Sequence, residues 1–90
     1  MTEIADKTVL ITGCASGIGR LLAEQLAAQG ARLALWDIDE AALLELTDQL
    51  NSAGYDATPY VCDLSDRARI GDCAARVLSE KGGVDILVNN

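Results

Sequence analysis

Short apolar runs alternate with longer segments of helical periodicity along the chain, and glycines separate the units. The first run covers residues 8–11 and is followed by a loop rich in glycine. Apolar residues then recur at helical spacing as far as Gly30, and glycine is favoured just after the C-terminus of a helix. The pattern predicts a strand, a loop and a helix whose apolar positions are Ile18, Leu21, Leu22 and Leu26.

The second unit has the same order of elements. Its strand is expected at residues 32–36 and ends at Asp37. Asp39 is the expected N-cap of the next helix, because aspartate is favoured at that position, and Gly54 ends the unit. The expected buried stripe of this helix consists of Leu43, Leu46 and Leu50.

The third unit places a strand at residues 57–62 and a helix for which Ser65 is the expected N-cap. Pro59 cannot donate a hydrogen bond to a neighbouring strand, so this strand is expected at an edge of the sheet. Gly82 and Gly83 end the helix, and residues 84–88 form a fourth apolar run. The expected buried stripe of the helix consists of Ile70, Cys73, Ala74, Val77 and Leu78.

The strands are apolar on both faces, which is typical of a parallel sheet with helices on each side. Strands that alternate with helices imply right-handed crossovers. We therefore predict the α/β class with a Rossmann-type three-layer αβα fold, in which a parallel sheet of four strands in order 3-2-1-4 carries three helices. Residues 1–90 are expected to form one domain or part of a larger one.

Charge and cysteine usage exclude several classes of partner. The net charge of −7 argues against nucleic acid and against an anionic membrane surface. The segment Met1–Asp6 lacks the features of a secretory signal, and no stretch has the length of a membrane-spanning helix. Cys14, Cys62 and Cys73 show no C-x-x-C spacing, so we expect reduced core thiols in a cytoplasmic protein, and we expect no metal site.

Three glycines lie between the first strand and the first helix, in the spacing T-G-x-x-x-G-x-G. In such a sheet the ligand crevice lies beyond the carboxyl ends of the strands. Bare backbone there allows close approach of a pyrophosphate, which the helix N-terminus attracts. We expect Gly13 to form the tight turn, Gly17 to permit the close approach, and Gly19 to let the helix pack on the strand. On the loop alone, a tight turn without a ligand is the alternative.

Asp37 adds a second signal at the end of the second strand. A carboxylate at this place accepts hydrogen bonds from a ribose diol, although a turn or a charge at a helix N-terminus is the alternative for Asp37 alone. Together with the glycine loop it favours a nucleotide site. Its charge would repel a 2′-phosphate, and Ile38 supplies no positive charge to hold one. NAD is therefore favoured over NADP.

With these motifs the chain resembles the classical short-chain dehydrogenase/reductase family, from about Lys7 to Asn90. The glycine loop is similar to the family's cofactor loop. Residues 62–64 (Cys-Asp-Leu) are similar to its aspartate segment after the third strand, and residues 85–90 to the strand that leads into its N-N-A-G motif. Without the resemblance, Asp63 and the two asparagines would be ordinary turn residues.

The resemblance implies a role for each matching position. The residues expected around the pyrophosphate and its ribose are Gly13, Ser16, Gly17, Ile18 and Gly19. Those expected around the adenosine are Asp37 and Ile38 at the ribose, and Asp63 and Leu64 at the adenine. Asn90, with Asn89 beside it, is expected to brace the sheet and to approach the cofactor.

The resemblance also implies a limit. The family's chemistry uses a serine and a Tyr-x-x-x-Lys pair, and neither Tyr55 nor Tyr60 has a lysine four residues later. We therefore expect no catalytic residue in residues 1–90, which read as the N-terminal NAD-binding part of an oxidoreductase that transfers a hydride between NAD(H) and an alcohol or carbonyl compound. The alternatives are a binding module without catalysis and a minimal structural fragment. A methyltransferase is disfavoured by the glycine spacing and the asparagine pair.

Strand order 3-2-1-4 leaves the fourth strand with an open outer edge. We expect the isolated chain to form a homo-oligomer through this edge or to be only marginally folded.

Overall fold

The computed structural model describes residues 4–90, and Met1–Glu3 of the acidic N-terminal segment lie outside the described residues. It contains a parallel four-stranded sheet in the order β3-β2-β1-β4, which confirms the predicted topology. The strands are β1 (Thr8–Thr12), β2 (Arg32–Asp37), β3 (Asp56–Val61) and β4 (Ile86–Asn89). The helices are α1 (Gly17–Ala28), α2 (Glu40–Ser52) and α3 (Arg67–Lys81).

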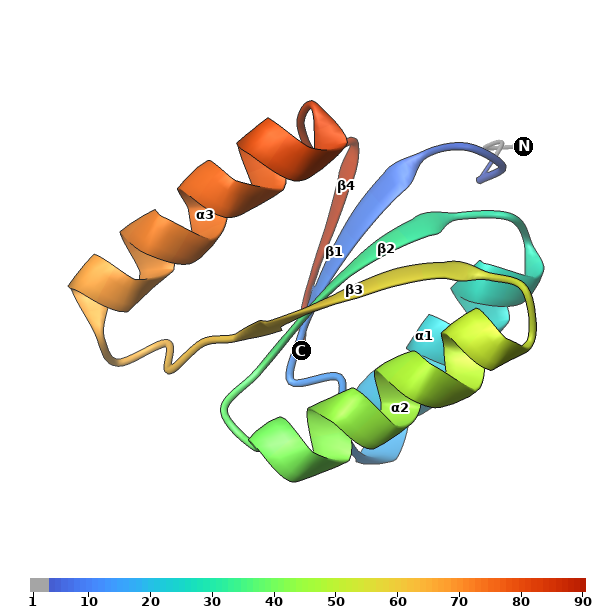
Figure 1. Cartoon of the computed structure of the whole chain (residues 1–90), viewed down its shortest axis with the longest axis horizontal. Coiled ribbons are helices and arrows are strands. Elements are labelled where there is room, and N and C mark those ends of the chain that lie inside the picture. The colour runs from blue at the N-terminus through green and yellow to red at the C-terminus, as the bar shows by residue number, and fades with distance from the viewer. Residues whose placement is uncertain (1–3) are drawn as a thin grey trace.

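The helices form two layers with the sheet between them, because α1 and α2 lie on one face and α3 on the other (Figure 1). Successive residues of a strand point to opposite faces, and both faces of the central strands β1 and β2 are buried. Val9 and Leu35 belong to the core under α1 and α2, whereas Leu10 and Trp36 belong to the core under α3. The three-layer prediction is therefore confirmed.

The register brings the carboxyl ends of the strands to one edge of the sheet. Thr12 lies beside Trp36 and Asn89, and Asp37 lies beside Val61. The loop after β1, the turn after β2 and the turn after β3 therefore begin next to one another. β3 is an edge strand, as Pro59 predicts.

The helix caps agree with the sequence at α2 and differ at α3. The Asp39 side chain accepts a hydrogen bond from the Ala42 N–H and caps α2 as expected. The cap of α3 is Asp66, which accepts from the Arg69 N–H, so the prediction of Ser65 is wrong by one residue. Ser65 instead donates its hydroxyl and its N–H to Asp63, which keeps it in the preceding turn.

The buried faces of α1 and α3 are narrower than expected. The face of α1 that meets the sheet consists of small residues, Gly19, Ala23 and Ala27, while Ile18 is 70% exposed and Leu21 is 53% exposed. Small side chains let the helix lie closer to the strands than leucines would. On α3 the buried residues are Cys73 and Val77, and Leu78 is 63% exposed because no described element covers that side of the helix.

β4 begins at Ile86, two residues later than the apolar run predicts. Asp85 exchanges hydrogen bonds with Thr8, since its N–H donates to the Thr8 carbonyl at 2.9 Å and its carboxylate accepts from the Thr8 N–H at 2.8 Å. This carboxylate takes the place of a backbone partner, so the regular ladder starts one residue further on.

Candidate functional site

The loop after β1 needs glycine for its backbone conformation. Gly13 has a φ of 64° and Gly17 a φ of 63°, a left-handed conformation that residues with a Cβ rarely adopt. The Gly13 N–H donates to the Trp36 carbonyl at 2.9 Å, which turns the chain away from β1 toward the end of β2. A Cβ on Gly17 would meet nothing within 4 Å, so this glycine is required by conformation and leaves open space beside it.

Gly19 is required for a different reason. A Cβ at this position would lie 2.3 Å from the Gly13 carbonyl oxygen and 2.7 Å from the Asn90 side-chain nitrogen. Both distances are far below van der Waals contact, so α1 can lie against the loop only with a hydrogen at position 19. Asn90 donates its side-chain amide to the same Gly13 oxygen at 3.0 Å. The loop, α1 and the residue after β4 thus form one close contact.

The N-terminus of α1 differs from those of the other two helices. Asp39 and Asp66 cap α2 and α3 with their side chains, whereas Ser16 at the start of α1 makes no such bond. The first turn of α1 contains no acidic residue either. The first N–H groups of a helix have no partner within the helix and carry partial positive charge. Within residues 4–90, neither a Ser16 side-chain cap nor an acidic residue of the first turn competes for these N–H groups. They can therefore still bind an anionic ligand.

Asp37 joins the end of β2 to the glycine loop. One carboxylate oxygen accepts from the Ala15 N–H at 2.9 Å, and the other accepts from the Asp39 N–H at 2.9 Å. A carboxylate offers about four lone-pair sites, so about two remain for another donor. The structure thus gives Asp37 a positioning role in the loop that its sequence context did not reveal, and it leaves acceptor capacity beside the loop.

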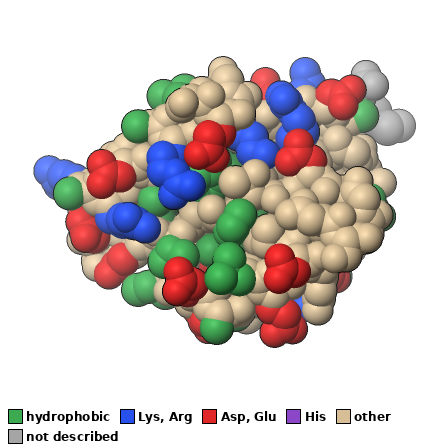
Figure 2. Space-filling model, viewed as in Figure 1, with side chains coloured by type: hydrophobic (Ala, Val, Ile, Leu, Met, Phe, Trp, Pro, Cys, Tyr) green, Lys and Arg blue, Asp and Glu red, His purple; other side chains and the backbone are tan. Residues whose placement is uncertain are grey.

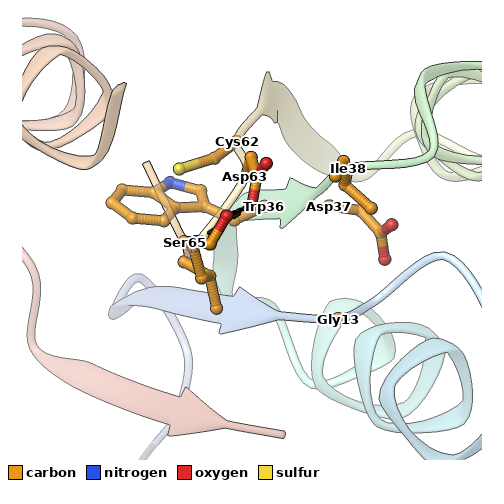
Figure 3. Close-up of a pocket in the computed structure, with 8 residues that line it drawn as sticks. Gly13, Trp36, Asp37, Ile38, Cys62, Asp63 and Ser65 are labelled. Atoms are coloured by element: carbon orange, nitrogen blue, oxygen red, sulfur yellow. Dashed lines mark hydrogen bonds between the residues drawn. The ribbon is translucent and has the colours of Figure 1, made fainter. Parts of the chain in front are cut away.

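A pocket of about 230 Å³ lies at the carboxyl ends of the strands (Figure 3). Asp37 and Ile38 lie on one side of it, and Trp36, Cys62, Asp63 and Ser65 lie on the other, with Gly13 at the start of the loop below. Its lining consists of Gly13, Trp36, Asp37, Ile38, Cys62, Asp63, Leu64 and Ser65. The indole of Trp36 is buried and provides an apolar wall.

The structure brings five of the predicted residues together in this pocket: Gly13, Asp37, Ile38, Asp63 and Leu64. The other six, Ser16, Gly17, Ile18, Gly19, Asn89 and Asn90, lie outside its lining. Asn89 and Asn90 both bind Thr12, since the Thr12 hydroxyl donates to the Asn89 side chain at 3.2 Å and accepts from the Asn90 N–H at 3.1 Å. These contacts tie the end of β4 to the end of β1.

The pocket lining also contains Trp36, Cys62 and Ser65, which were not predicted from the sequence. Ser65 is the informative one, because its hydroxyl donates to one Asp63 oxygen at 2.7 Å and its N–H donates to the same oxygen at 2.9 Å. These two bonds, the hydroxyl first, lower the pKa of the Asp63 carboxyl. The D-x-S spacing is a recognisable turn signal and would have identified the pair.

Replacement of Ser65 by alanine is expected to raise the pKa of Asp63 toward its ordinary value. A carboxyl whose pKa is lower in the folded state stabilises the fold above its unfolded pKa, and this contribution is lost as the pH falls through the folded pKa. Ser65→Ala therefore reduces the part of the stability that disappears in acid, below about pH 4. A carbon-detected NMR titration of the Asp63 carboxyl measures the shift, and an unchanged titration midpoint would show that the hydroxyl bond does not act on Asp63.

The cysteines near the site are buried. Burial, followed by the negative charge of Asp37, raises the pKa of the Cys14 thiol to about 12. Burial, followed by a hydrogen bond with Cys73, raises the pKa of Cys62 to about 11. Such thiols are almost entirely protonated at neutral pH, so they act as small core side chains, as expected.

The side chains of Arg20, Tyr60 and Lys81 could bind a phosphate or transfer a proton, but each is already bound to another side chain of the chain. Arg20 donates to Gln49 at 2.7 Å and lies 3.4 Å from Glu24, so its guanidinium is held over α2. The Tyr60 hydroxyl is buried and donates to Glu80, and Lys81 pairs with Asp56 at the opposite end of β3. Across residues 4–90 no group of His, Cys, Asp and Glu side chains is arranged to hold a metal ion.

The surface around the pocket combines apolar and acidic side chains. Figure 2 shows apolar side chains gathered below α3, over the carboxyl ends of β2 and β3, with acidic side chains around them. Ile38 is 64% exposed and Leu64 is 49% exposed in this region. As for membranes, none of the helices in the described part of the chain has the length and hydropathy needed to cross one.

A family model and similar proteins of known sequence all indicate the same family for this chain. The family model described as short chain dehydrogenase matches residues 7–90. Mouse 17-beta-hydroxysteroid dehydrogenase 13 is 42% identical over 88 residues, which cover 98% of this chain and 29% of that protein. Mouse epidermal retinol dehydrogenase 2 is 44% identical over 89 residues, with 98% and 29% covered. The chain therefore belongs to the short-chain dehydrogenase family, a family of oxidoreductases.

Solved structures agree with this assignment. A short chain dehydrogenase/reductase from Burkholderia phymatum in complex with NAD superposes with a TM-score of 0.92 at 38% identity, over 97% of this chain and 31% of that one. A hydroxysteroid dehydrogenase from Escherichia coli gives a TM-score of 0.92 at 33% identity, over 98% and 37%. The chain spans about a third of the length of the relatives that it matches.

Proposed function

We propose that residues 1–90 form the NAD(H)-binding half of a short-chain dehydrogenase domain. The observation that carries the proposal is the helix start without a side-chain cap beside a loop of obligate glycines. The diphosphate would lie against the N–H groups of residues 17–19, close to the unobstructed backbone at Gly17. Ser16 and Ile18 are the side chains of that turn that are exposed to it.

The adenosine half of the cofactor fits the pocket. Asp37 has free acceptor capacity for the ribose hydroxyls, and the Ile38 side chain lies beside it. Asp63 and Leu64 would flank the adenine, with the indole of Trp36 as the wall of the pocket. An apolar pocket with a few fixed polar groups is the usual form of such a site. Asn89 and Asn90 would approach the cofactor from the end of β4.

The charges beside the pocket favour NAD over NADP as part of this proposal. Asp37 places a carboxylate where a 2′-phosphate would lie, and like charges at this distance repel. Arg20, at the start of α1, is committed to Gln49, Glu24 and the more distant Glu45 at 4.0 Å. Moving it to a phosphate would leave these acceptors without their partner.

For the whole protein we propose hydride transfer between NAD(H) and an alcohol or carbonyl compound. The support is the family, since the similar proteins in it include a hydroxysteroid dehydrogenase and a retinol dehydrogenase. Residues 1–90 would supply cofactor binding, and the acid–base groups would come from outside them.

We further propose a cytoplasmic location without a nucleic-acid partner, on the basis of the free cysteines and the net charge of −7. A non-catalytic binding module remains the second candidate, because the site described here serves cofactor binding alone.

Trp36 provides a direct test, because it is the single tryptophan of the chain and lines the pocket. We expect NAD⁺ to quench its fluorescence with a saturable curve, and nicotinamide mononucleotide, which lacks the adenosine half, to cause no saturable change. Equal responses to the two ligands would contradict the placement of adenosine in this pocket. No response to NAD⁺ at millimolar concentration would contradict binding by this chain.

A further inference from the structure

Two neighbouring turns of the pocket are built alike. Asp37 ends β2, and Asp63 comes two residues after the end of β3, which is the next strand of the sheet. Each carboxylate accepts the N–H of the residue two positions later at 2.9 Å, from Asp39 in the first turn and from Ser65 in the second. Asp37 lies on one side of the pocket and Asp63 on the other (Figure 3). The two turns therefore present a pair of carboxylates to one ligand.

The two carboxylates differ in how their oxygens are used. At Asp37 each oxygen accepts one N–H, from Ala15 and from Asp39. At Asp63 both bonds go to Oδ1, because the Ser65 hydroxyl donates to this oxygen at 2.7 Å in addition to the Ser65 N–H. The Oδ2 oxygen takes no part in these bonds, and a carboxylate oxygen has about two lone pairs. Asp63 thus keeps one whole oxygen as an acceptor for a ligand.

The bond from Ser65 to Asp63 also decides which hydrogens the pocket can offer. A serine hydroxyl has one hydrogen, and Ser65 uses it on Asp63. The ring nitrogen of Trp36 is buried and Cys62 is 3% exposed, so neither offers its hydrogen to a ligand. In the described part of the chain, the side chains that line the pocket therefore present acceptors, above all Asp37 and Asp63, and no free donor. Such a pocket favours a ligand that brings its own hydrogens.

We propose that Ser65 is a positioning residue that makes the pocket select adenine over a base with a carbonyl in place of the amino group. The inference rests on the proposed function, because it takes the adenosine half of the cofactor as the occupant of the pocket. Ser65 fixes the Asp63 carboxylate through Oδ1, and Oδ2 accepts a hydrogen of the amino group. A carbonyl oxygen at the same place brings no hydrogen and meets a negative charge, so both oxygens stay unpaired.

Two dinucleotides that differ in this one group test the inference. NAD⁺ carries adenine, whereas nicotinamide hypoxanthine dinucleotide carries a carbonyl oxygen in place of the amino group. In calorimetric titrations of the chain at neutral pH, we expect the wild type to bind NAD⁺ about 10- to 100-fold more tightly than the hypoxanthine dinucleotide. Ser65→Ala frees the carboxylate from one of its two bonds, so this ratio should fall at least about threefold. Ser65→Thr keeps a hydroxyl and should restore the ratio.

Two further variants serve as controls. Ser52→Ala makes the same chemical change at an exposed serine, the last residue of α2, which lies outside the pocket lining. It should keep the wild-type ratio. Asp63→Asn replaces the carboxylate by an amide, which can donate to a carbonyl as well as accept from an amino group. This variant should bind the two dinucleotides about equally.

The outcomes separate the role of Ser65 from the proposed function. If the wild type bound neither dinucleotide, the proposed function would be contradicted and the inference would fail with it. If both bound and Ser65→Ala kept the wild-type ratio, or Ser65→Thr behaved as Ser65→Ala does, cofactor binding would stand and the role of Ser65 would be overturned. Equal binding of the two dinucleotides by the wild type would overturn it as well, and this measurement needs no variant.

Discussion

Gly19→Ala is expected to lower the free energy of unfolding by about 1–3 kcal/mol and to remove detectable NAD⁺ binding. The added methyl group would lie 2.3 Å from the Gly13 oxygen, which is backbone and cannot rotate away. Either α1 moves away from β1 or the glycine loop changes its path. Both changes displace the N–H groups that would face the diphosphate. Urea unfolding measures the first effect, and titration with NAD⁺ measures the second.

Gly71→Ala is the matched control, because Gly71 lies inside α3 and a Cβ there meets nothing within 4 Å. Alanine is favoured over glycine in a helix, so this variant should gain about 0.5–1 kcal/mol and bind NAD⁺ as the wild type does. If Gly19→Ala also gained stability and kept its affinity, the close packing of α1 on the loop would have no role in the site.

Asp37→Ala is expected to weaken NAD⁺ binding about 10- to 100-fold, because each hydrogen bond to a charged group contributes about 1.5–3 kcal/mol. The substitution also removes the acceptor for the Ala15 N–H, so part of the loss would come from a loosened loop. Asp37→Asn separates the two effects. It keeps an oxygen for the Ala15 N–H but removes the negative charge and the acceptor for the Asp39 N–H, so the preference for NAD⁺ over NADP⁺ should fall while the glycine loop keeps its bond to residue 37.

Asp39→Asn controls for the general effect of charge. It removes one negative charge two residues away, and asparagine caps helices about as well as aspartate. Isothermal titration calorimetry with both cofactors should give the wild-type ratio of affinities for this variant. If Asp39→Asn and Asp37→Asn shifted the ratio equally, the specificity would come from net charge and the ribose assignment to Asp37 would be wrong.

The fold could be predicted from the sequence because its main signals are local. The apolar runs at β1 and β2 are long enough to mark strands that are buried on both sides, and Asp39 and Gly30 mark helix ends by residue type. The order of strands and helices then restricts the topology to a few arrangements. Pro59 indicated the edge position of β3 by the same kind of local argument.

Features that depend on distance between elements could not be predicted. Periodicity assigned Ile18 to the buried face of α1, but the helix lies on Gly19, Ala23 and Ala27 because close approach favours small residues. Leu78 follows the apolar pattern of α3 yet stays exposed, since burial also needs a neighbour. The bond from Asp37 to Ala15 joins residues that are distant in sequence, and no local pattern reports it.

The central claim is that the N–H groups of residues 17–19, where the glycine loop enters α1, hold the cofactor's diphosphate. Nitrogen–proton correlation NMR of the chain with increasing NAD⁺ tests it residue by residue. We expect saturable shifts at the amides of Gly13, Gly17, Ile18 and Gly19 and at the Trp36 indole, with Gly71 unchanged. Shifts confined to other parts of the chain, with these five signals unmoved at saturation, would contradict the claim.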